Sequence, residues 1–329
     1  MRKAMVLCCL LAVGFGSCKK QDGGESKTVI AVIPKGTLHI FWKSIHAGAI
    51  KAAEELGVEI IWKGPLKEDD RDDQIKVVEN MIVRGVTGIV LAPLDDMALR
   101  IPVQNAKRSD IPVVIIDSGL NSDDYVSFVA TDNYVGGRKG GKHLAELLGG
   151  KGKVVMLRYA EGSASTSKRE QGFLDAIGES PGIEVVSSTL YAGATVESGM
   201  EASENLLAPL KTAEGKLTID GIFCPNESST FGMLRHLQDS KQAGKVMFVG
   251  FDSSEPLVKA LRAGELHGLV LQDPINMGYL GVKTIVQHLR GETVVKQMDT
   301  GSVLATPENM DEETIKNLLK PDFATWLQE

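Results

Sequence analysis

The chain has 329 residues, a length that fits two domains of ordinary size. Its residues are 43% apolar and 24% charged, as in soluble globular proteins, and its formal net charge is −7. No stretch concentrates Lys and Arg, so the composition argues against a nucleic-acid partner.

The first eighteen residues have the features of an export signal. A basic start precedes the apolar residues 4–15, a stretch too short to span a membrane as a permanent helix. Small residues and Cys18 follow, and this arrangement resembles a bacterial lipoprotein signal. That resemblance implies removal of residues 1–17, lipidation of Cys18 and a flexible tether at 18–27; an ordinary signal peptide cut nearby is the alternative. We expect an exported protein, in the periplasm or at the cell surface, with a lipid anchor to the membrane.

Cysteine usage points to a protein stabilised by its core. Cys8, Cys9 and Cys18 belong to the leader or its end, so Cys224 stands alone in the rest of the chain. An exported protein with one spare thiol has no disulfide framework. Cys224 lies inside the apolar run GIFCP, and we expect a buried, unreactive thiol rather than a catalytic one.

From Thr28 onward, short apolar runs of strand composition alternate with helical patterns. In the first half, strands are predicted at 28–34, 58–62, 88–93, 112–117 and 125–132, with helices near 41–56, 72–84 and 96–108. In the second half, strands are predicted at 152–159, 183–191, 221–226, 245–252 and 267–273, with helices near 134–148, 166–178, 197–209, 228–239 and 255–263. A last helical stretch at 276–290 fits either half. Continuous apolar strands between helices predict an α/β fold with two Rossmann-like, doubly wound parallel-sheet lobes.

Polar residues stand at the ends of several predicted strands. In open α/β sheets, ligands bind beyond the carboxyl ends of the strands. If the two lobes face each other, these strand ends line one cleft: Asp117, Thr131–Asp132, Asn226, Asp252 and Gln272. A buried carboxylate is costly unless it is paired or hydrogen-bonded, so Asp117 and Asp252 are predicted to be ligand acceptors.

Other motifs are better explained by structure than by chemistry. GGRKGGKH at 136–143 departs from a P-loop at its last residue, and small residues for close packing of a helix explain it better. The acidic run at 67–73 lacks calcium-loop spacing, so solvation and the dipole of the following helix explain it. The Ser/Thr-rich run at 162–170 is expected to cap and open the helix that carries Arg169. With no paired histidines and no nucleophile elbow, we expect no metal, no cofactor and no catalytic residues.

Two adjacent aromatic residues, Phe41 and Trp42, stand at a loop-to-helix start in a chain that is only 5% aromatic. Either ring could simply enter the core. A flat ring near a cleft mouth would instead offer an apolar face to the C–H face of a sugar.

Seven blocks occur in order over nearly all of the mature chain: GIVLAPLDD, IPVVIID, FVATDNYVGG, SKREQGF, FCPNESS, VGFDSS and LQDP. In these blocks the chain resembles the periplasmic sugar-binding proteins of bacterial ABC transporters, of the ribose, allose and galactose type with the type I periplasmic binding-protein fold. The resemblance implies two lobes, residues 28–130 plus 273–301 and residues 131–272 plus 302–329, joined by a three-segment hinge. It also implies closure around one monosaccharide and delivery to an ABC permease in the cytoplasmic membrane. We further expect a monomer.

The resemblance places ligand-binding positions on this chain one by one. These positions are Lys35, His39, Phe41, Trp42, Asp117, Arg169, Asn226, Asp252 and Gln272. It implies that the paired aromatics abut the sugar ring, that Asp117 accepts two hydroxyls, and that Arg169 donates to the ring oxygen and to hydroxyls. Carboxylate acceptors, guanidinium donors and amides that do both suit a ligand whose hydroxyls donate and accept.

The chain also departs from the family pattern. His39 stands where many members have Asn, Ser118 where ribose binders place a second Arg, and Ala92 where some members have Asn. Lys35 resembles the lysine of allose-type members. These features put ribose in doubt and favour an aldohexose or a related monosaccharide.

Three other functions share parts of this pattern. Chemotaxis receptors and sensor kinases use the same fold as an input, so ligand sensing is the alternative function. A lac-repressor-type regulator shares the fold but begins with a helix-turn-helix, where this chain has an export signal. A carbohydrate-active enzyme needs a positioned acid and base. Arg169 beside Asp117 and Asp252 favours their charged, hydrogen-bonding forms instead.

Overall fold

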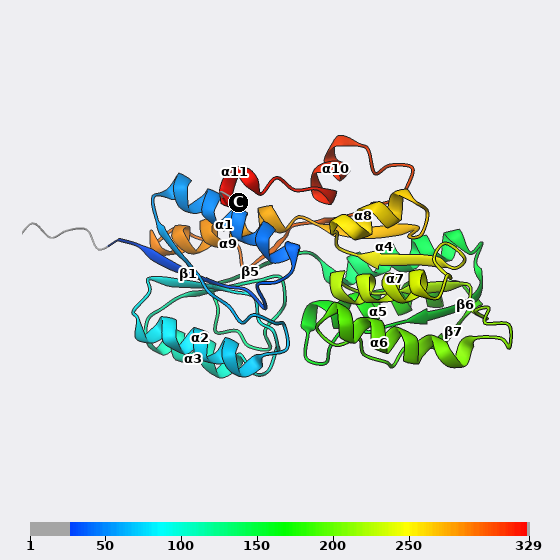
Figure 1. The fold of residues 1–329 in the computed structure, drawn as a ribbon. Helices are drawn as coiled ribbons and strands as arrows, with labels where there is room; N and C mark the ends of the chain where they lie inside the picture. The colour runs from blue at the N-terminus through cyan, green and yellow to red at the C-terminus, as the bar shows by residue number, and fades with distance from the viewer. Residues whose placement is uncertain (1–26, 328–329) are drawn as a thin grey trace, which may run out of the picture.

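The computed structural model describes residues 27–327. The predicted leader at 1–17, Cys18 and the tether as far as residue 26 lie outside the described residues. Two lobes lie side by side in Figure 1, each built on its own sheet with helices on both faces. No helix within residues 27–327 is both long enough and apolar enough to cross a membrane.

The sheet of the first lobe has the order β11-β5-β4-β3-β1-β2 in the described part of the chain, and all of its pairings are parallel. Its strands are β1 Val29–Ile33, β2 Glu59–Trp62, β3 Gly88–Leu91, β4 Val113–Ile116, β5 Ser127–Ala130 and β11 Gln297–Asp299. Helices α1 (Ile40–Leu56) and α9 (Pro274–Leu289) pack on one face, and α2 (Arg71–Val83) and α3 (Arg100–Arg108) on the other. The central strands are therefore apolar throughout because both of their faces are covered.

The second lobe repeats this plan with the order β12-β10-β9-β8-β6-β7. Its strands are β6 Lys151–Met156, β7 Gly182–Ser187, β8 Gly221–Phe223, β9 Met247–Phe251, β10 Gly268–Gln272 and β12 Ser302–Ala305. Helices α4 (Asn133–Leu147) and α5 (Ala164–Gly178) cover one face. The other face is covered by α6 (Val196–Leu207), α7 (Glu227–Asp239) and α8 (Glu255–Arg262), while the 3₁₀ turn η1 (Ala208–Leu210) extends α6. The strand β12 differs from its counterpart because it pairs antiparallel with β10.

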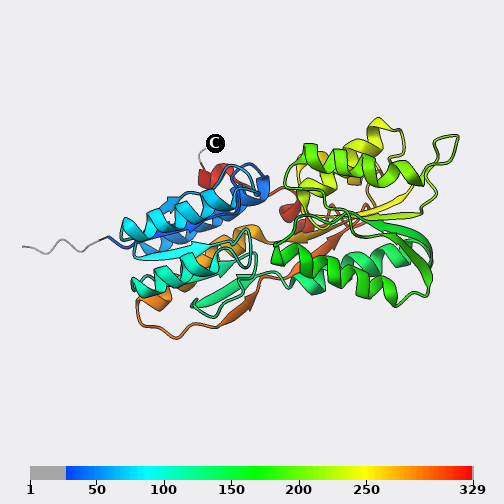
Figure 2. The same cartoon turned by 90° about the horizontal axis from the view of Figure 1, so that it is seen from below.

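The chain passes between the lobes where β5 leads to α4, where β10 leads to α9 and where β11 leads to β12 (Figure 2). The stretch left open by the sequence, 276–290, lies in α9 and packs on the first lobe. After α10 (Glu313–Leu319), the last described helix, α11 (Ala324–Leu327), returns to α1 of the first lobe. The segment 302–329 was expected to belong wholly to the second lobe, and this return to α1 departs from that expectation.

Glycine lets one pair of helices approach closely in each lobe. A Cβ at Gly137 of α4 would stand 1.9 Å from the backbone oxygen of Arg169 in α5. A Cβ at Gly48 of α1 would stand 1.9 Å from the backbone oxygen of Ile275 in α9. The glycine-rich run at 136–143 is therefore a packing feature, as predicted from its sequence.

The predicted fold class is confirmed, and so is the burial of the lone thiol. Cys224 is free and fully buried, and burial raises the pKa of its thiol well above the usual value. All predicted strands and helices are present, with ends that differ by a few residues. The short elements β11, β12, α10 and α11 had not been predicted.

Candidate functional site

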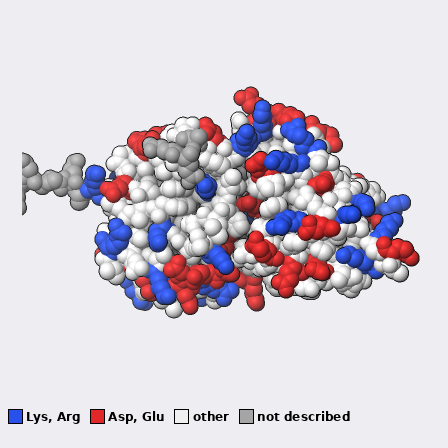
Figure 3. Space-filling model, viewed as in Figure 1, with Lys and Arg blue, Asp and Glu red and all other residues white. Residues whose placement is uncertain are grey.

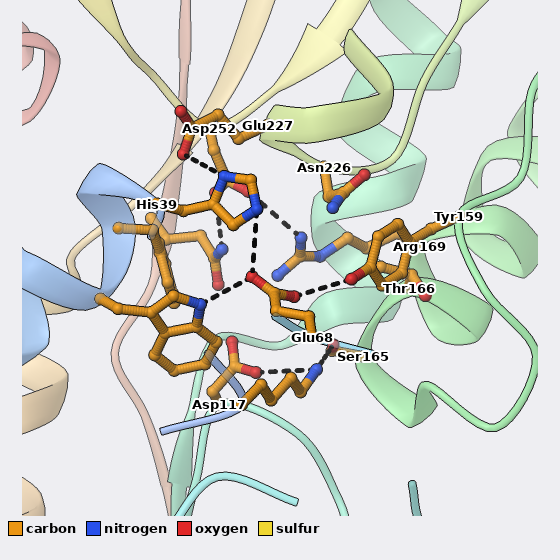
Figure 4. Close-up of a pocket in the computed structure, with 14 residues that line it drawn as sticks. His39, Glu68, Asp117, Tyr159, Ser165, Thr166, Arg169, Asn226, Glu227 and Asp252 are labelled. Carbon is orange, nitrogen blue, oxygen red and sulfur yellow. Dashed lines mark hydrogen bonds and ion pairs between the residues drawn. The ribbon is translucent and has the colours of Figure 1, made fainter. Parts of the chain in front are cut away.

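A narrow cavity lies between the carboxyl ends of the strands of the two sheets, with a volume of about 30 Å³ accessible to water (Figure 4). The structure brings all nine predicted positions to its wall: Lys35, His39, Phe41, Trp42, Asp117, Arg169, Asn226, Asp252 and Gln272. Five further residues complete the lining: Glu68, Tyr159, Ser165, Thr166 and Glu227. Both lobes contribute polar and charged side chains, so a ligand here would be held from two sides.

Asp117 and Asp252 reach the cavity through the same backbone conformation. Each follows a buried strand, β4 or β9, and each has a left-handed φ, +60° and +65°. Their N–H groups donate to the adjacent strands, at 3.2 Å to the Val129 oxygen and 2.8 Å to the Val270 oxygen. Asp tolerates this region better than most residues do, so the strand ends sharply and its carboxylate turns into the cavity.

Asp117 is paired with a buried lysine. Lys35 follows β1, and its Nζ lies 3.0 Å from Oδ2 of Asp117, with both side chains only 4% exposed. The same Nζ lies 3.0 Å from Oγ of Ser165, on the other lobe. Lys35 therefore neutralises the carboxylate of its own lobe and also joins the two lobes.

Asp252 is supported within its own lobe. Gln272, at the end of β10, donates from Nε2 to Oδ1 of Asp252 at 2.7 Å. The nearest guanidinium nitrogen of Arg169 lies 3.6 Å from Oδ2. Burial raises the pKa of the Asp252 carboxyl, while Arg169 and Gln272 act in the opposite direction.

Arg169 is held in a fixed plane on α5. Its Nε donates to Oδ1 of Asn133 at 2.7 Å, and one terminal nitrogen donates to the Pro225 oxygen at 3.0 Å. The guanidinium carbon lies 4.0 Å from the centre of the Phe251 ring, a favourable cation–π arrangement. Such a fixed planar group presents its remaining donors to the cavity without loss of side-chain freedom.

The two aromatic residues serve both the core and the cavity. Their rings meet edge to face, with centroids 5.0 Å apart and planes at 89°. Trp42 is buried in the core of the first lobe, while its Nε1 donates to Oε1 of Glu68 at 2.7 Å. Phe41 is half-buried and also lines the cavity. Trp42 therefore packs in the core, and both rings also line the cavity, so each of the two alternatives considered from the sequence applies.

Glu68 had not been identified from the sequence, because the acidic run at 67–73 was explained by solvation and a helix dipole. That explanation fits Asp70, whose side chain caps α2 by accepting from the Asp73 N–H at 3.0 Å. It is wrong for Glu68, which accepts a hydrogen bond at 2.8 Å from the hydroxyl of Tyr159 on the other lobe. Glu68 follows β2 at the same edge of the sheet as Asp117, and this position could have identified it from the sequence.

Glu227 and His39 face each other across the cavity (Figure 4). Nδ1 of His39 lies 3.9 Å from Oε2 of Glu227, and Nε2 lies 3.7 Å from Oε1 of Glu68. Within residues 27–327, Oε2 of Glu227 is buried without a hydrogen-bond partner. Burial, together with the charges of Asp252 and Glu68, raises the pKa of Glu227 to about 8.

Two expectations about polar residues need correction. Ser163 precedes α5 as predicted, but its side chain makes no cap; it accepts from Lys35 at 3.4 Å. Thr131 and Asp132 do not line the cavity. Asp132 instead caps α4 by accepting from the Val135 N–H at 3.0 Å, because the chain crosses to the other lobe at this point.

The described residues contain no group of three His, Cys, Asp or Glu side chains that could hold a metal ion. The hydroxyl of Ser165 lies beside Lys35, but the ammonium group of Lys35 is paired with Asp117 and therefore does not act as a base. The chemistry of the cavity is that of recognition, with carboxylates, a guanidinium, amides and two rings converging on one space.

Residues 30–293 match the family model described as "Periplasmic binding protein domain". The chain is 32% identical to the ribose import binding protein of Haemophilus influenzae, over 89% of this chain and 96% of that protein. A carbohydrate transporter solute-binding protein from Agrobacterium radiobacter, in complex with D-arabinose, gives a TM-score of 0.84 at 33% identity, covering 90% of this chain and 100% of the other. An ABC transporter solute-binding protein from Agrobacterium vitis, with bound D-fucose, gives 0.83 at 35% identity, covering 88% and 99%. The chain therefore belongs to the periplasmic binding protein family, whose members are exported solute-binding proteins rather than enzymes, and it is homologous to binding proteins of sugar ABC transporters.

Proposed function

We propose that this protein is an extracytoplasmic solute-binding lipoprotein that captures a monosaccharide between its lobes and delivers it to an ABC sugar importer. The observation that carries the proposal is the convergence of Asp117 from one lobe with Asp252 and Arg169 from the other on one largely buried cavity. Hydrogen bonds from sugar hydroxyls to carboxylates, and from a guanidinium to sugar oxygens, are the strong, charge-assisted kind. The relatives that bind ribose, D-arabinose or D-fucose by their names support a monosaccharide.

Each part of the lining has a role in this proposal. Phe41 and Trp42 offer ring surface to the C–H face of the sugar. Asp117 and Asp252 accept hydrogen bonds from hydroxyls, and Arg169 donates. Asn226 and Gln272 supply amides, and Lys35 and His39 complete the polar wall. Oε1 of Gln272 is buried without a partner among the described residues, so it is an acceptor that a sugar hydroxyl would satisfy.

Hinge closure is the proposed mechanism. The lobes would move about the three crossings, at 130/131, 272/273 and 301/302. Cross-lobe hydrogen bonds support a closed arrangement: the Asp96 N–H donates to the Gly162 oxygen at 3.1 Å, and the Ser165 N–H to Oγ of Ser118 at 3.1 Å. A ligand favours closure only through contacts that it gains in the closed form, and a site divided between two lobes provides them.

The finer parts of the proposal rest on the sequence. Lipidation of Cys18 would tether the lobes to the membrane through residues 18–27, close to the permease. An aldohexose is favoured over ribose because Ser118 stands where ribose binders have an arginine. The protein would act as a monomer, since each chain carries both halves of the cavity.

A thermal-shift panel of pentoses, hexoses, polyols and nucleosides tests the proposal on the chain from residue 27 onward. A sugar at a thousand times its Kd should stabilise the folded state by about 4 kcal/mol and raise the Tm clearly. The Asp117→Asn/Asp252→Asn double variant should lose the shift. A flat panel, after unfolding and refolding to remove any carried sugar, would contradict the proposal and point to a signal molecule sensed by a receptor.

A further inference from the structure

The cavity lining contains more carboxyl groups than basic side chains. It includes four carboxylates, of which Asp117 is paired with Lys35 and Asp252 with Arg169. The remaining two, Glu68 and Glu227, have no Lys or Arg partner among the described residues, and the imidazole of His39 lies 3.7 Å from Glu68 and 3.9 Å from Glu227. An unpaired carboxylate in a buried site is costly, so a ligand that brings a cation would relieve this cost.

The hydrogen-bonding capacity of the cavity is also unbalanced. The side-chain N–H or O–H donors of Trp42, Tyr159 and Gln272 each already donate to a cavity carboxylate. Within residues 27–327, two lining side chains have a buried polar atom without a partner, and both atoms are acceptors: Oε2 of Glu227 and Oε1 of Gln272. Gln272 is only 4% exposed. These atoms call for a ligand with more donors than acceptors, and an ammonium group has three donors and no acceptor.

A neighbouring cavity is also lined by more acidic than basic side chains. A second cavity between the lobes shares Lys35, Glu68 and Tyr159 with the first. Its wall adds Asp69, Asp70, Asp72 and Glu161 against a single added cation, Arg71. In Figure 3, Asp and Glu side chains also gather on both sides of the junction between the lobes. Clefts lined by one sign of charge concentrate ligands of the opposite sign.

We propose that the ligand is a monosaccharide bearing a primary amine, and that Glu227 receives its ammonium group with Glu68 and His39 beside it. This inference rests on the proposed sugar-binding function and specifies its substrate class. The aspartates, Arg169 and the rings would hold the rest of the sugar, while the amine occupies the end of the cavity near His39. A neutral sugar hydroxyl could bond to the unpaired oxygen while Glu227 keeps its proton, whereas an ammonium group would pair with the ionised carboxylate.

Ammonium binding has a consequence that a neutral sugar lacks. Glu227 is faced by His39 from the start of α1, Glu68 from the β2–α2 loop and Asp252 from the end of β9, and the Phe41 N–H lowers its pKa in part. With a pKa of about 8, Glu227 carries a proton at pH 7 when no cation is near. Binding of an ammonium ion would ionise Glu227, so amine binding should release close to one proton.

Isothermal titration calorimetry with matched sugar trios tests the inference on the full mature chain. Each trio comprises a hexose, its amino-deoxy form (D-glucosamine, D-galactosamine, D-mannosamine or 3-amino-3-deoxy-D-glucose) and the N-acetylated amine. We expect one amine to bind at least tenfold more tightly than both neutral members of its trio, with proton release seen by comparing two buffers. If the neutral hexose binds most tightly in every trio, the inference is overturned and the sugar-binding function stands. If no member of any trio binds, both the inference and the proposed sugar-binding function are contradicted.

A pair of near-isosteric variants assigns the effect to one residue. Glu227→Gln should weaken amine binding by tenfold or more, abolish the proton release and remove the preference for the amine over the neutral members of its trio. Glu255→Gln is the matched control because Glu255 is the first residue of α8 as Glu227 is of α7, and its side chain is exposed. If Glu227→Gln keeps the amine preference, the assignment to Glu227 is wrong. Melting curves of both variants verify that they fold.

Discussion

The two lobes share one architecture and differ in how each supports its aspartate at the cavity. The order β2-β1-β3-β4-β5-β11 matches β7-β6-β8-β9-β10-β12, so Asp117 and Asp252 follow equivalent strands. Both aspartates have the same left-handed backbone, and both N–H groups bond to the next strand. The shared fold therefore delivers two carboxylates to the cavity, and the residues around each carboxylate determine its electrostatics.

The partners of Asp117 depend more on closure of the two lobes than the partners of Asp252 do. The cation beside Asp117, Lys35, takes a second partner, Ser165, from the other lobe. Asp252 has Gln272 and Arg169, both from its own lobe. We infer that the half-site of the second lobe is organised before the lobes close, and that closure completes the half-site of the first.

A second equivalent pair shows the same contrast more strongly. Asp95 lies two residues after the proline that follows β3. Glu227 lies two residues after the proline that follows β8. Asp95 accepts from the Met97 and Ala98 N–H groups and lies 3.0 Å from Nε of Arg71. Glu227 has no equivalent cation at that distance among the described residues. One position is thus structural in the first lobe and available to a ligand in the second.

The largest expected effect comes from removing the cation of the second lobe. Arg169→Met would leave the buried Asp252 without a charge partner and Asn133 without its donor. Breaking a buried pair from one side costs about 3–5 kcal/mol, and we expect that loss of stability in urea unfolding, together with loss of sugar binding. Arg262→Met, which removes the exposed pair with Asp311, should leave the stability nearly unchanged because solvent screens such a pair. Equal losses in the two variants would refute an organised half-site in the second lobe.

The unpaired Glu227 predicts an unusual dependence of stability on pH. Its folded pKa is raised, so the folded state holds more protons than the unfolded state between about pH 4.5 and 8. The resulting stabilisation is present at low pH and is lost as pH rises towards 8. Between pH 5 and pH 8 we expect Glu227 to lower the free energy of unfolding by about 2–4 kcal/mol. Urea unfolding at both pH values measures this fall, and Glu227→Gln should remove it.

Two partly buried histidines, His236 and His267, act in the opposite direction over part of this range. Burial lowers the pKa values of His236 and His267, so their contribution to stability grows as pH rises through the range near 6.5. The contributions of the histidines cancel when the free energies of unfolding of the wild-type protein and Glu227→Gln are subtracted at each pH. Glu255→Gln should show the same pH dependence of stability as the wild type. The same slope in Glu227→Gln and in the wild type would show that Glu227 is paired in solution.

The two aspartates can be compared directly in a double-mutant cycle. Asp117→Asn and Asp252→Asn should each weaken sugar binding by about 1.5–3 kcal/mol, because each replaces a charged acceptor with a neutral one. Lys35→Met should weaken binding in the Asp252→Asn background but add little in the Asp117→Asn background, since Lys35 pairs with Asp117. Titration calorimetry of the single and double variants gives the coupling energies. Equal coupling of Lys35 to both aspartates would contradict the separate support that we infer.

Much of the fold and of the cavity lining could be predicted from the sequence because both follow from strand ends. Apolar runs fixed the parallel sheets, and polar residues directly after those runs had to meet at one edge. Asp117, Asp252 and Gln272 follow from this rule alone, while Lys35, His39 and Arg169 needed the resemblance to the family. All nine predicted residues line the cavity in the structure.

The residues that were missed depend on how the lobes meet. Glu68 and Tyr159 come from loops, and each acquires its role through a partner distant in sequence, across the cavity. Glu227 stands beside the predicted Asn226, yet nothing local distinguishes it from an exposed acid in the first turn of a helix. The strands β11 and β12 are three and four residues long, too short for a periodic pattern, and their pairing is set by the crossings.

The smallest expected effect tests the closed arrangement itself. Tyr159→Phe removes the hydrogen bond from the second lobe to Glu68 and leaves the Trp42 donor in place. A single hydrogen bond of this kind contributes about 0.5–1.5 kcal/mol, so sugar affinity should fall by no more than about tenfold. The matched control is Tyr279→Phe, whose hydroxyl donates to Glu55 at 2.7 Å within the first lobe. If the bond favours closure, only Tyr159→Phe should also increase the radius of gyration of the unliganded protein in X-ray scattering. An affinity loss without that increase would mean that Tyr159 acts on the sugar directly, and that contacts such as Lys35 with Ser165 suffice to keep the lobes together.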